Sequence, residues 1–323
     1  MDFLRTYTDQ IEQVSVDECY LDFTGIADRF SSPVAAAFEI KDEVLRRFGF
    51  TVNVGISTNK LLAKMASDFE KPNKVHTLFP EEIREKMWPL PIRELYMAGS
   101  SSVRTLEKLE VRTIGDLARL DREAAASILG RQGCTLHDYA TGAEHSPVVP
   151  AREQPGPKSV GNGLTFPRNL VGWAELHAGV TELADEVAVR LRGHGLKCTT
   201  LQVTIRDPNF KDICRQKRLS APTYVARELS EVAMELIRAA WRENAPVRAL
   251  TLTAQALVEE GEAGEQLDLF AAGAAPRRDK LEKLEKAMDG IRDKFGRDAI
   301  APASTVHRDR AEVKAEQRLP PVD

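Results

Sequence analysis

The chain has 323 residues, of which 42% are hydrophobic and 29% are charged, and its formal net charge is −4. This length allows two or three domains with buried cores, and the sequence has neither a signal peptide nor an apolar run long enough to span a bilayer. The four cysteines form no C-x-x-C pair. We therefore expect a globular cytoplasmic protein without membrane association, in which any nucleic-acid binding depends on local charge.

The first 79 residues alternate between strand and helix patterns. Such alternation predicts an α+β fold of the split βαβ kind. The predicted elements are, in order, a strand hairpin over 11–23, a helix over 32–50 that stops at Gly49, a short buried strand over 51–58, a helix over 59–71 ended by Pro72, and a strand over 75–79.

From residue 80 to about residue 141 the pattern changes to short helices, which we expect to be broken at Gly99, Gly115 and Gly133. The segment 146–157 is rich in proline and polar residues and is the clearest linker in the chain. A β-α-β-β-α-β domain is predicted after it. Its elements are a strand over 158–167, a helix over 173–194, strands over 197–206 and 213–220, a helix over 224–243 and a strand over 247–257.

One more helix is predicted over 278–295, beyond a stretch rich in Gly, Ala and Glu. Its apolar residues recur at a spacing of three to four, which marks a narrow stripe on one side of the helix. The helix is too short for a persuasive coiled coil, so we expect it to dock on the body of the protein, and we expect 301–323 to be disordered. The stripe consists of Leu281, Leu284, Met288, Ile291 and Phe295.

Asp17 and Glu18 interrupt the first strand segment with two adjacent acids. Neighbours in an ideal strand point to opposite faces, whereas at a hairpin turn both can reach one ligand. Two carboxylates held together repel each other, and a divalent cation such as Mg²⁺ relieves this while keeping positions for water or phosphate. On spacing alone, a plain polar turn is the more common explanation for such a pair.

Three segments resemble the Y-family DNA polymerases, specifically the bacterial DNA polymerase IV type. They are "QVSVDECYLDFTG" from Gln13, "NVGISTNKLLAKMASDFEKPN" from Asn53, and the β-α-β-β-α-β tail; the similarity runs in order from about Leu4 to Phe270. The resemblance implies five parts. They are a partial catalytic palm at 1–79, a helical thumb at 80–145, a linker at 146–157, a little-finger DNA-binding domain at 158–257, and a clamp-binding peptide, short helix and flexible tail at 258–323.

The resemblance also implies template-directed, error-prone translesion synthesis in DNA repair, with two Mg²⁺ ions as cofactors. Asp17 then matches a metal ligand, and Glu18 matches the catalytic acid and metal ligand beside the primer 3′-hydroxyl. Lys71 matches a lysine that reaches the phosphates of the incoming deoxynucleoside triphosphate, although a lysine at a helix C-terminus more commonly just satisfies the dipole. The family's usual glycine after "KPN" is Lys74 here.

In this family the palm begins with a strand that carries another metal-binding aspartate, followed by the fingers. Only fourteen residues precede Ser15 in this sequence, and Asp2 and Asp9 lack the apolar context of such a strand. We therefore expect the chain to start inside the palm, without one metal ligand and without a cover over the nascent base pair. By itself it should polymerise poorly or not at all.

Two regions are predicted to hold primer–template DNA. Residues 96–120 resemble a helix-hairpin-helix in which Gly99, Ser101 and a helix beginning near Ser102 present backbone amides to phosphate, with an ordinary capping turn as the alternative. In the last domain, basic residues gather on the strands and acidic residues on the helices, which favours a sheet face along a DNA backbone over a merely solvated face. The basic residues are Lys158, Arg168, Lys197, Arg206, Lys211, Arg215, Lys217 and Arg218.

The peptide "EQLDLF" (265–270) resembles the pentapeptide by which bacterial polymerases bind the sliding clamp, through Gln266, Leu267, Leu269 and Phe270. The apolar start of a helix is the alternative. We expect a monomer whose partners are DNA, deoxynucleoside triphosphates and the clamp. Two other functions stay open: a non-catalytic DNA- and clamp-binding protein derived from such a polymerase, and a nucleotidyl cyclase with a similar palm, which would need neither thumb, linker nor clamp peptide.

Overall fold

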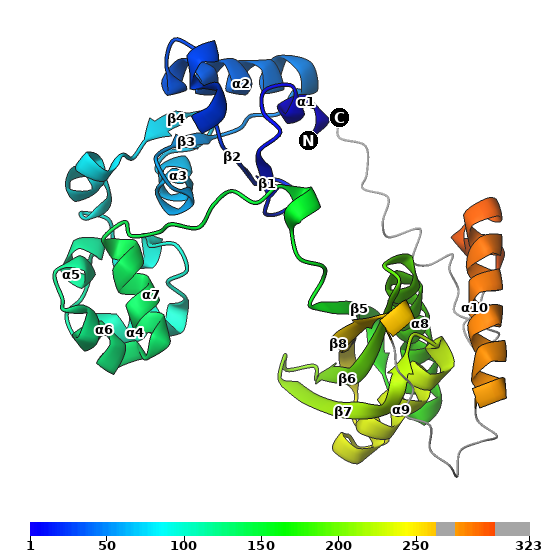
Figure 1. The fold of residues 1–323 in the computed structure, drawn as a ribbon. Coiled ribbons are helices and arrows are strands. Elements are labelled where there is room, and N and C mark those ends of the chain that lie inside the picture. The colour runs from blue at the N-terminus through cyan, green and yellow to red at the C-terminus, as the bar shows by residue number, and fades with distance from the viewer. Residues whose placement is uncertain (263–274, 301–323) are drawn as a thin grey trace, which may run out of the picture. The chain divides into compact units, whose positions relative to one another are not determined.

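The computed structural model describes residues 1–262 and 275–300 (Figure 1). The chain divides into two compact units, Met1–Pro155 and Gly156–Asp323, and the division falls inside the predicted linker. Within the described stretches, none of the helices has the length and apolarity that a membrane crossing requires.

The first unit begins with a helical turn, α1 (Asp2–Arg5), and a hairpin of two antiparallel strands, β1 (Ile11–Gln13) and β2 (Cys19–Leu21). The backbone amides of Val14 and Ser15 donate to the carbonyl of Glu18 at 3.0 and 3.2 Å and close the turn. The predicted hairpin is confirmed, with the two acids at its turn.

Two helices, α2 (Pro33–Phe48) and α3 (Lys60–Ser67), contact the parallel strand pair β3 (Val54–Ile56) and β4 (Val75–Thr77). The α2 helix stops at Gly49, as predicted.

Two expectations about this region were wrong in extent. The strand predicted over 51–58 is three residues long and only half-buried, and α3 ends at Ser67 instead of Lys71. The side-chain amide of Asn53 explains the early end, because it donates to the carbonyls of Ser67 and Glu70 and so captures groups that a longer helix would use.

Short helices follow from residue 80 to residue 140, as predicted. They are η2 (Pro80–Glu82), η3 (Ile83–Met87), η4 (Ile92–Glu94), α4 (Ser100–Glu107), α5 (Ile114–Ala118), α6 (Arg122–Leu129) and α7 (Arg131–Ala140). One buried cluster joins α3 to these helices through side chains such as Leu62, Leu78 and Leu136. The expected boundary after residue 79 therefore lies within a shared core.

Of the three predicted helix breaks, only Gly99 stands before a helix. Gly115 and Gly133 lie inside α5 and α7, so these two breaks were wrong. Gly133 serves close packing, because a Cβ there would lie 1.9 Å from the carbonyl oxygen of Ala125 in α6. The break between α6 and α7 falls at Gly130, whose φ of 62° suits glycine.

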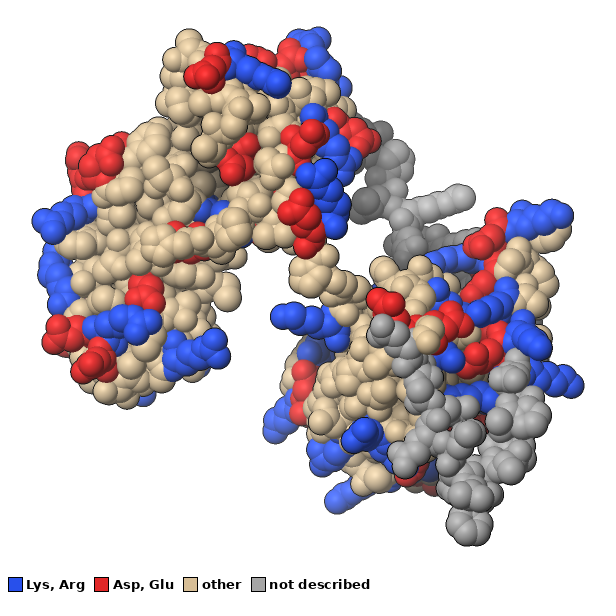
Figure 2. Space-filling view, viewed as in Figure 1, with Lys and Arg blue, Asp and Glu red and all other residues tan. Residues whose placement is uncertain are grey.

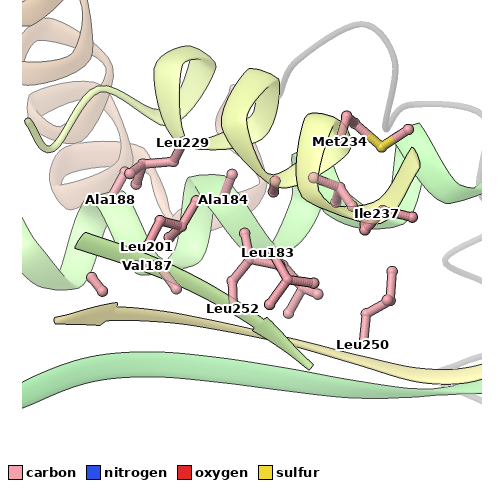
Figure 3. Close-up of a cluster of buried hydrophobic side chains, with 14 of the residues drawn as sticks. Leu183, Ala184, Val187, Ala188, Leu201, Leu229, Met234, Ile237, Leu250 and Leu252 are labelled. Carbon is pink, nitrogen blue, oxygen red and sulfur yellow. The ribbon is translucent and has the colours of Figure 1, made fainter. Parts of the chain in front are cut away.

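The second unit consists of β5 (Ser159–Leu170), α8 (Trp173–Gly193), β6 (Leu196–Arg206), β7 (Asp212–Thr223), α9 (Ala226–Ala240) and β8 (Val247–Glu259). The strands form an antiparallel sheet of order β5-β8-β6-β7, with α8 and α9 on one face (Figures 1 and 3). Leu183 and Val187 of α8 and Ile237 of α9 pack against Leu201 and Leu252 of the sheet (Figure 3). The predicted β-α-β-β-α-β order is confirmed.

The last helix, α10 (Ala275–Phe295), docks on the second unit, as predicted, but mainly through charges. Arg192 of α8 is 5% exposed and pairs with Glu285 and Asp289 of α10, and Arg292 of α10 pairs with Asp185 at 2.8 Å.

The apolar stripe of α10 contributes little to this docking. Leu281 packs against the core of the unit, whereas Leu284, Ile291 and Phe295 stay 55%, 38% and 68% exposed. On α8, the residues that pair with α10 are the charged side chains Asp185 and Arg192. The predicted disorder of 301–323 lies outside the described residues.

Replacing Arg192 with Met should release α10 while the sheet stays folded. The change removes the guanidinium from two half-buried carboxylates, leaving Glu285 with the backbone amide of Ala226 and Asp289 with Arg292 at 4.0 Å. Breaking a buried ion pair in this way costs about 3–5 kcal/mol, and we expect that loss to exceed the free energy that holds α10 on the unit. Hydrogen–deuterium exchange should show lost amide protection in α10 alone. Arg227→Met removes an exposed α9 pair with Glu231 and is the matched control; unchanged α10 protection in the Arg192 variant would contradict the prediction.

Candidate active site and nucleic-acid interface

The turn between β1 and β2 presents Asp17 at the surface. The hydroxyl of Ser15 donates to Oδ1 of Asp17 at 2.6 Å and accepts from the backbone amide of Glu18 at 3.1 Å. The hydrogen bond from Ser15, helped by the backbone amide of Asp17 and the charges of Lys64 and Lys71, holds the pKa of Asp17 below its usual range. Its carboxylate is therefore ionised at neutral pH and is available to a cation.

Lys64 of α3 lies against the second acid of the turn. Its Nζ is 2.6 Å from Oε1 of Glu18 and 3.1 Å from Oδ2 of Asp68, and its side chain is only 17% exposed. Burial lowers the pKa of the Lys64 ammonium, but the hydrogen bonds from it to Glu18 and Asp68 outweigh burial and raise the pKa overall. Lys64 is therefore charged and bridges two carboxylates.

Lys71 joins the same group of charges through Asp68. Its Nζ lies 2.8 Å from Oδ1 of Asp68, and its side chain is 61% exposed. Burial raises the pKa of Asp68, yet the hydrogen bonds from Lys71 and Lys64 outweigh this and lower it. The result is a continuous series, Glu18–Lys64–Asp68–Lys71, which we call the ion-pair chain.

The structure thus brings the predicted residues Asp17, Glu18 and Lys71 into one site. Lys64 and Asp68 complete the site, and the sequence analysis did not single them out. The sequence did contain a signal for these two ion pairs. Lys64 and Asp68 are four residues apart and Asp68 and Lys71 three apart, which are the spacings at which side chains of opposite charge meet on a helical turn.

The donor chemistry of the turn suits Mg²⁺, which prefers carboxylate oxygens and is commonly held by one or two carboxylates together with water and substrate phosphates. Asp17 and Glu18 fit such a site as two of its ligands. Across the described residues, no three His, Cys, Asp or Glu side chains are grouped so as to hold a metal. An ion at this turn would depend on ligands beyond the two acids.

The predicted phosphate-binding hairpin is the N-terminus of α4. Gly99 is the N-cap, and within residues 1–262 and 275–300 no side chain caps this helix. Ser101 and Ser102 therefore lie in a first turn whose amides have no side-chain partner in those ranges. The helix begins at Ser100, earlier than the predicted Ser102. The element before it is a single 3₁₀ turn, η4, instead of the full helix that a helix-hairpin-helix has.

One face of the second unit's sheet is polar. Leu201, Val203 and Ile205 are at most 1% exposed and point toward α8 and α9, so Gln202 and Thr204 point the other way. Cross-strand partners share a face, and the register therefore defines a surface that we call the open sheet face. Its members on three strands are Thr200, Gln202, Thr204 and Arg206 of β6, Asp212, Cys214, Gln216 and Arg218 of β7, and Thr251, Thr253 and Gln255 of β8.

The predicted basic residues do not all lie on this face. Arg206 and Arg218 do, with Arg206 paired to Asp212 at 2.7 Å. Arg215 and Lys217 stand opposite Val203 and Leu201, so they lie on the helix side of β7.

The other predicted basic residues have different surroundings. Lys197 is 13% exposed and bound to Glu282 of α10 at 2.8 Å. Arg168 makes a two-armed ion pair with Glu175 of α8. Lys158 and Lys211 are exposed, one just before β5 and the other in the β6–β7 turn.

Figure 2 shows Lys and Arg side chains projecting where β6 and β7 lie in Figure 1, with few acids among them. The peptide of Gln266, Leu267, Leu269 and Phe270 lies outside the described residues.

Both units of the chain match one family of known proteins. Residues 1–68 match the impB/mucB/samB family and residues 157–269 match the impB/mucB/samB family C-terminal domain. The DNA polymerase IV of Acetivibrio thermocellus is 36% identical over 290 residues, which cover 90% of this chain and 72% of the relative. The DNA polymerase IV of Clostridium acetobutylicum is 35% identical over 300 residues, covering 93% and 74%.

A solved Y-family DNA polymerase chimera superposes with a TM-score of 0.70 at 25% identity, covering 80% of this chain and 74% of that one. Its mixed helix and sheet architecture agrees with the predicted α+β fold, and the four-stranded sheet agrees with a little finger. On the relatives and the fold together, the chain belongs to the Y family (impB/mucB/samB) of DNA polymerases.

Proposed function

We propose that this protein is a translesion DNA polymerase that extends primer–template DNA with deoxynucleoside triphosphates in the tolerance of DNA damage. The observation that carries the proposal is that the ion-pair chain links Glu18, beside Asp17 on the hairpin turn, to Lys71. Lys71 lies more than fifty positions later in the sequence. The names of the relatives support the same reaction. In this proposal residues 1–79 are a partial palm, 80–145 a thumb, 146–157 a linker and 158–257 a little finger.

Bound Mg²⁺ ions would lower the pKa of the primer 3′-hydroxyl and neutralise the triphosphate. The ionised, exposed carboxylate of Asp17 is placed to be a ligand, and Glu18 beside it to be a second. Lys71 is the exposed end of the ion-pair chain, and its flexible stem lets the ammonium leave Asp68 for a phosphate. The first-turn amides of α4 and the open sheet face would hold the DNA backbone without reading its sequence.

We propose further that the 323-residue chain by itself polymerises slowly. In support, the described residues supply no third acid to the turn, and Glu18 is already paired with Lys64. Such a chain would bind DNA and nucleotide but catalyse the transfer of nucleotides to the primer only slowly.

Primer extension tests the reaction. The purified chain with Mg²⁺ and four deoxynucleotides should extend a primer far more slowly than the Acetivibrio relative assayed beside it, and Glu18→Ala should abolish what remains. Glu70→Ala, on the loop after α3, is the control. Extension as fast as that of the relative would contradict the slow-chain proposal, and extension that survives Glu18→Ala would contradict the role of Glu18.

The alternative function is a non-catalytic DNA- and clamp-binding protein. The pairing of Glu18 with Lys64 favours it, because a neutralised acid is a poorer metal ligand. DNA binding with no extension by any variant would decide for this alternative.

Arg218→Ala should weaken primer–template binding equally for all sequences. One lost phosphate contact should reduce the slope of log affinity against log salt by about 0.9. Fluorescence anisotropy across a salt series measures this slope. Arg227→Ala removes the same charge from the helix side of the unit and should leave it unchanged; equal slopes for both variants would mean that the open sheet face does not contact DNA.

We also propose that the protein is a cytoplasmic monomer that binds the bacterial sliding clamp through Gln266, Leu267, Leu269 and Phe270. The clamp-binding part of this proposal rests on the sequence of the peptide alone. Replacing Leu269 and Phe270 with Ala removes both apolar anchors and should reduce clamp affinity at least tenfold in surface plasmon resonance, since two buried side chains contribute more than about 1.4 kcal/mol. Undiminished affinity would place the clamp contact elsewhere.

A further inference from the structure

Lys64 stands where a cation bound to Glu18 would stand. Its side chain is the more buried of the pair, with 17% of Lys64 exposed against 46% of Glu18. The two side chains come from separate elements, α3 and the hairpin turn, so folding itself creates the contact. An ammonium 2.6 Å from Oε1 already neutralises this carboxylate.

The same ammonium has a second carboxylate within reach. Oδ2 of Asp68 lies 3.1 Å from Nζ of Lys64, at the end of the same helix. Lys64 can therefore shift its hydrogen bonds from Glu18 to Asp68 by side-chain rotation, without any movement of the backbone. Its charge remains compensated throughout the shift.

Asp68 is in turn shared between two lysines. Oδ1 accepts from Lys71 and Oδ2 from Lys64, so the two acids and two lysines of the ion-pair chain sum to zero charge. If Lys71 turns toward a triphosphate, Asp68 loses one of its partners and can take Lys64 fully. Glu18 is then released at the opposite end of the ion-pair chain.

We propose that the Lys64 ammonium neutralises Glu18 until a divalent cation binds. Lys64 then transfers its hydrogen bonds from Glu18 to Asp68, which leaves the Glu18 carboxylate free to bind the cation. Lys64 and Asp68 are positioning residues that set the metal affinity of the hairpin turn. Because Lys71 competes for Asp68, the ion-pair chain couples triphosphate binding to metal binding. This inference rests on the proposed function, in which Glu18 is a metal ligand.

Titration of the full chain with Mn²⁺ alone tests the role of Lys64. Electron paramagnetic resonance measures the concentration of free Mn²⁺ and so gives the binding affinity. Lys64→Met removes the competing cation and should tighten Mn²⁺ binding about fivefold, as expected for loss of an ion pair of about 1 kcal/mol. Asp68→Asn removes the alternative partner, leaves Lys64 on Glu18, and should weaken binding by a similar factor. Lys64→Gln should behave like Lys64→Met and guards against a variant that folds poorly.

The matched controls are Lys74→Met and Glu70→Gln. These residues form another i, i+4 ion pair, at 3.2 Å, on the loop that follows the same helix. Each should change Mn²⁺ affinity less than twofold.

Repeating the measurement in a Glu18→Gln variant distinguishes an effect of the Lys64–Glu18 contact from a long-range effect of the Lys64 charge on the bound cation. If Lys64 acts through Glu18, Lys64→Met should change nothing there. If Lys64→Met tightens Mn²⁺ binding equally with and without the Glu18 carboxylate, the inference is overturned, because the loss of one positive charge alone would explain the change. If Lys64→Met weakens Mn²⁺ binding, the inference is also overturned, because Lys64 would then only orient the Glu18 carboxylate. If neither the parent chain nor any variant binds Mn²⁺, the metal site of the proposed function fails as well.

Discussion

Two adjacent carboxylates at the tip of a short hairpin need positive charge nearby, and the contact between Glu18 and Lys64 supplies it. This ion pair ties the hairpin turn to α3. Through Asp68 it reaches Lys71, so the candidate nucleotide-binding lysine and the candidate metal ligands belong to one electrostatic unit. The chemistry of the site depends on how the ion pairs of this chain rearrange when metal ions and nucleotide bind.

In the second unit, strand register decides which charges can serve DNA. The alternation of Leu201, Gln202, Val203 and Thr204 sends apolar side chains to the helices and leaves a polar face opposite. Because cross-strand partners share a face, the basic residues of β7 are divided between the two sides. The open sheet face is therefore less basic than the strands that build it, and its Thr and Gln side chains are suited to hydrogen bonds with phosphate and sugar.

The α10 helix lies beyond the residues that match the family domain, which end at 269. It binds by buried and half-buried charges and occupies basic residues, Arg192 and Lys197, that the strand and helix pattern alone would leave to solvent or DNA. Its apolar side chains Leu284, Ile291 and Phe295 face outward instead. Complementary charge on the receiving surface outweighs the apolar stripe.

The sequence by itself determined the order of elements, the hairpin with its two acids and the family, because these follow from local periodicity, capping residues and motif strings. It did not predict the end of α3, the positions of Gly115 and Gly133 inside helices, or the dispersal of the eight basic residues. These depend on contacts between distant segments: the Asn53 side chain caps Ser67 and Glu70, and α6 approaches Gly133. Only the tertiary structure decided that Lys64 meets Glu18, because a pair separated by 46 positions has no local signal.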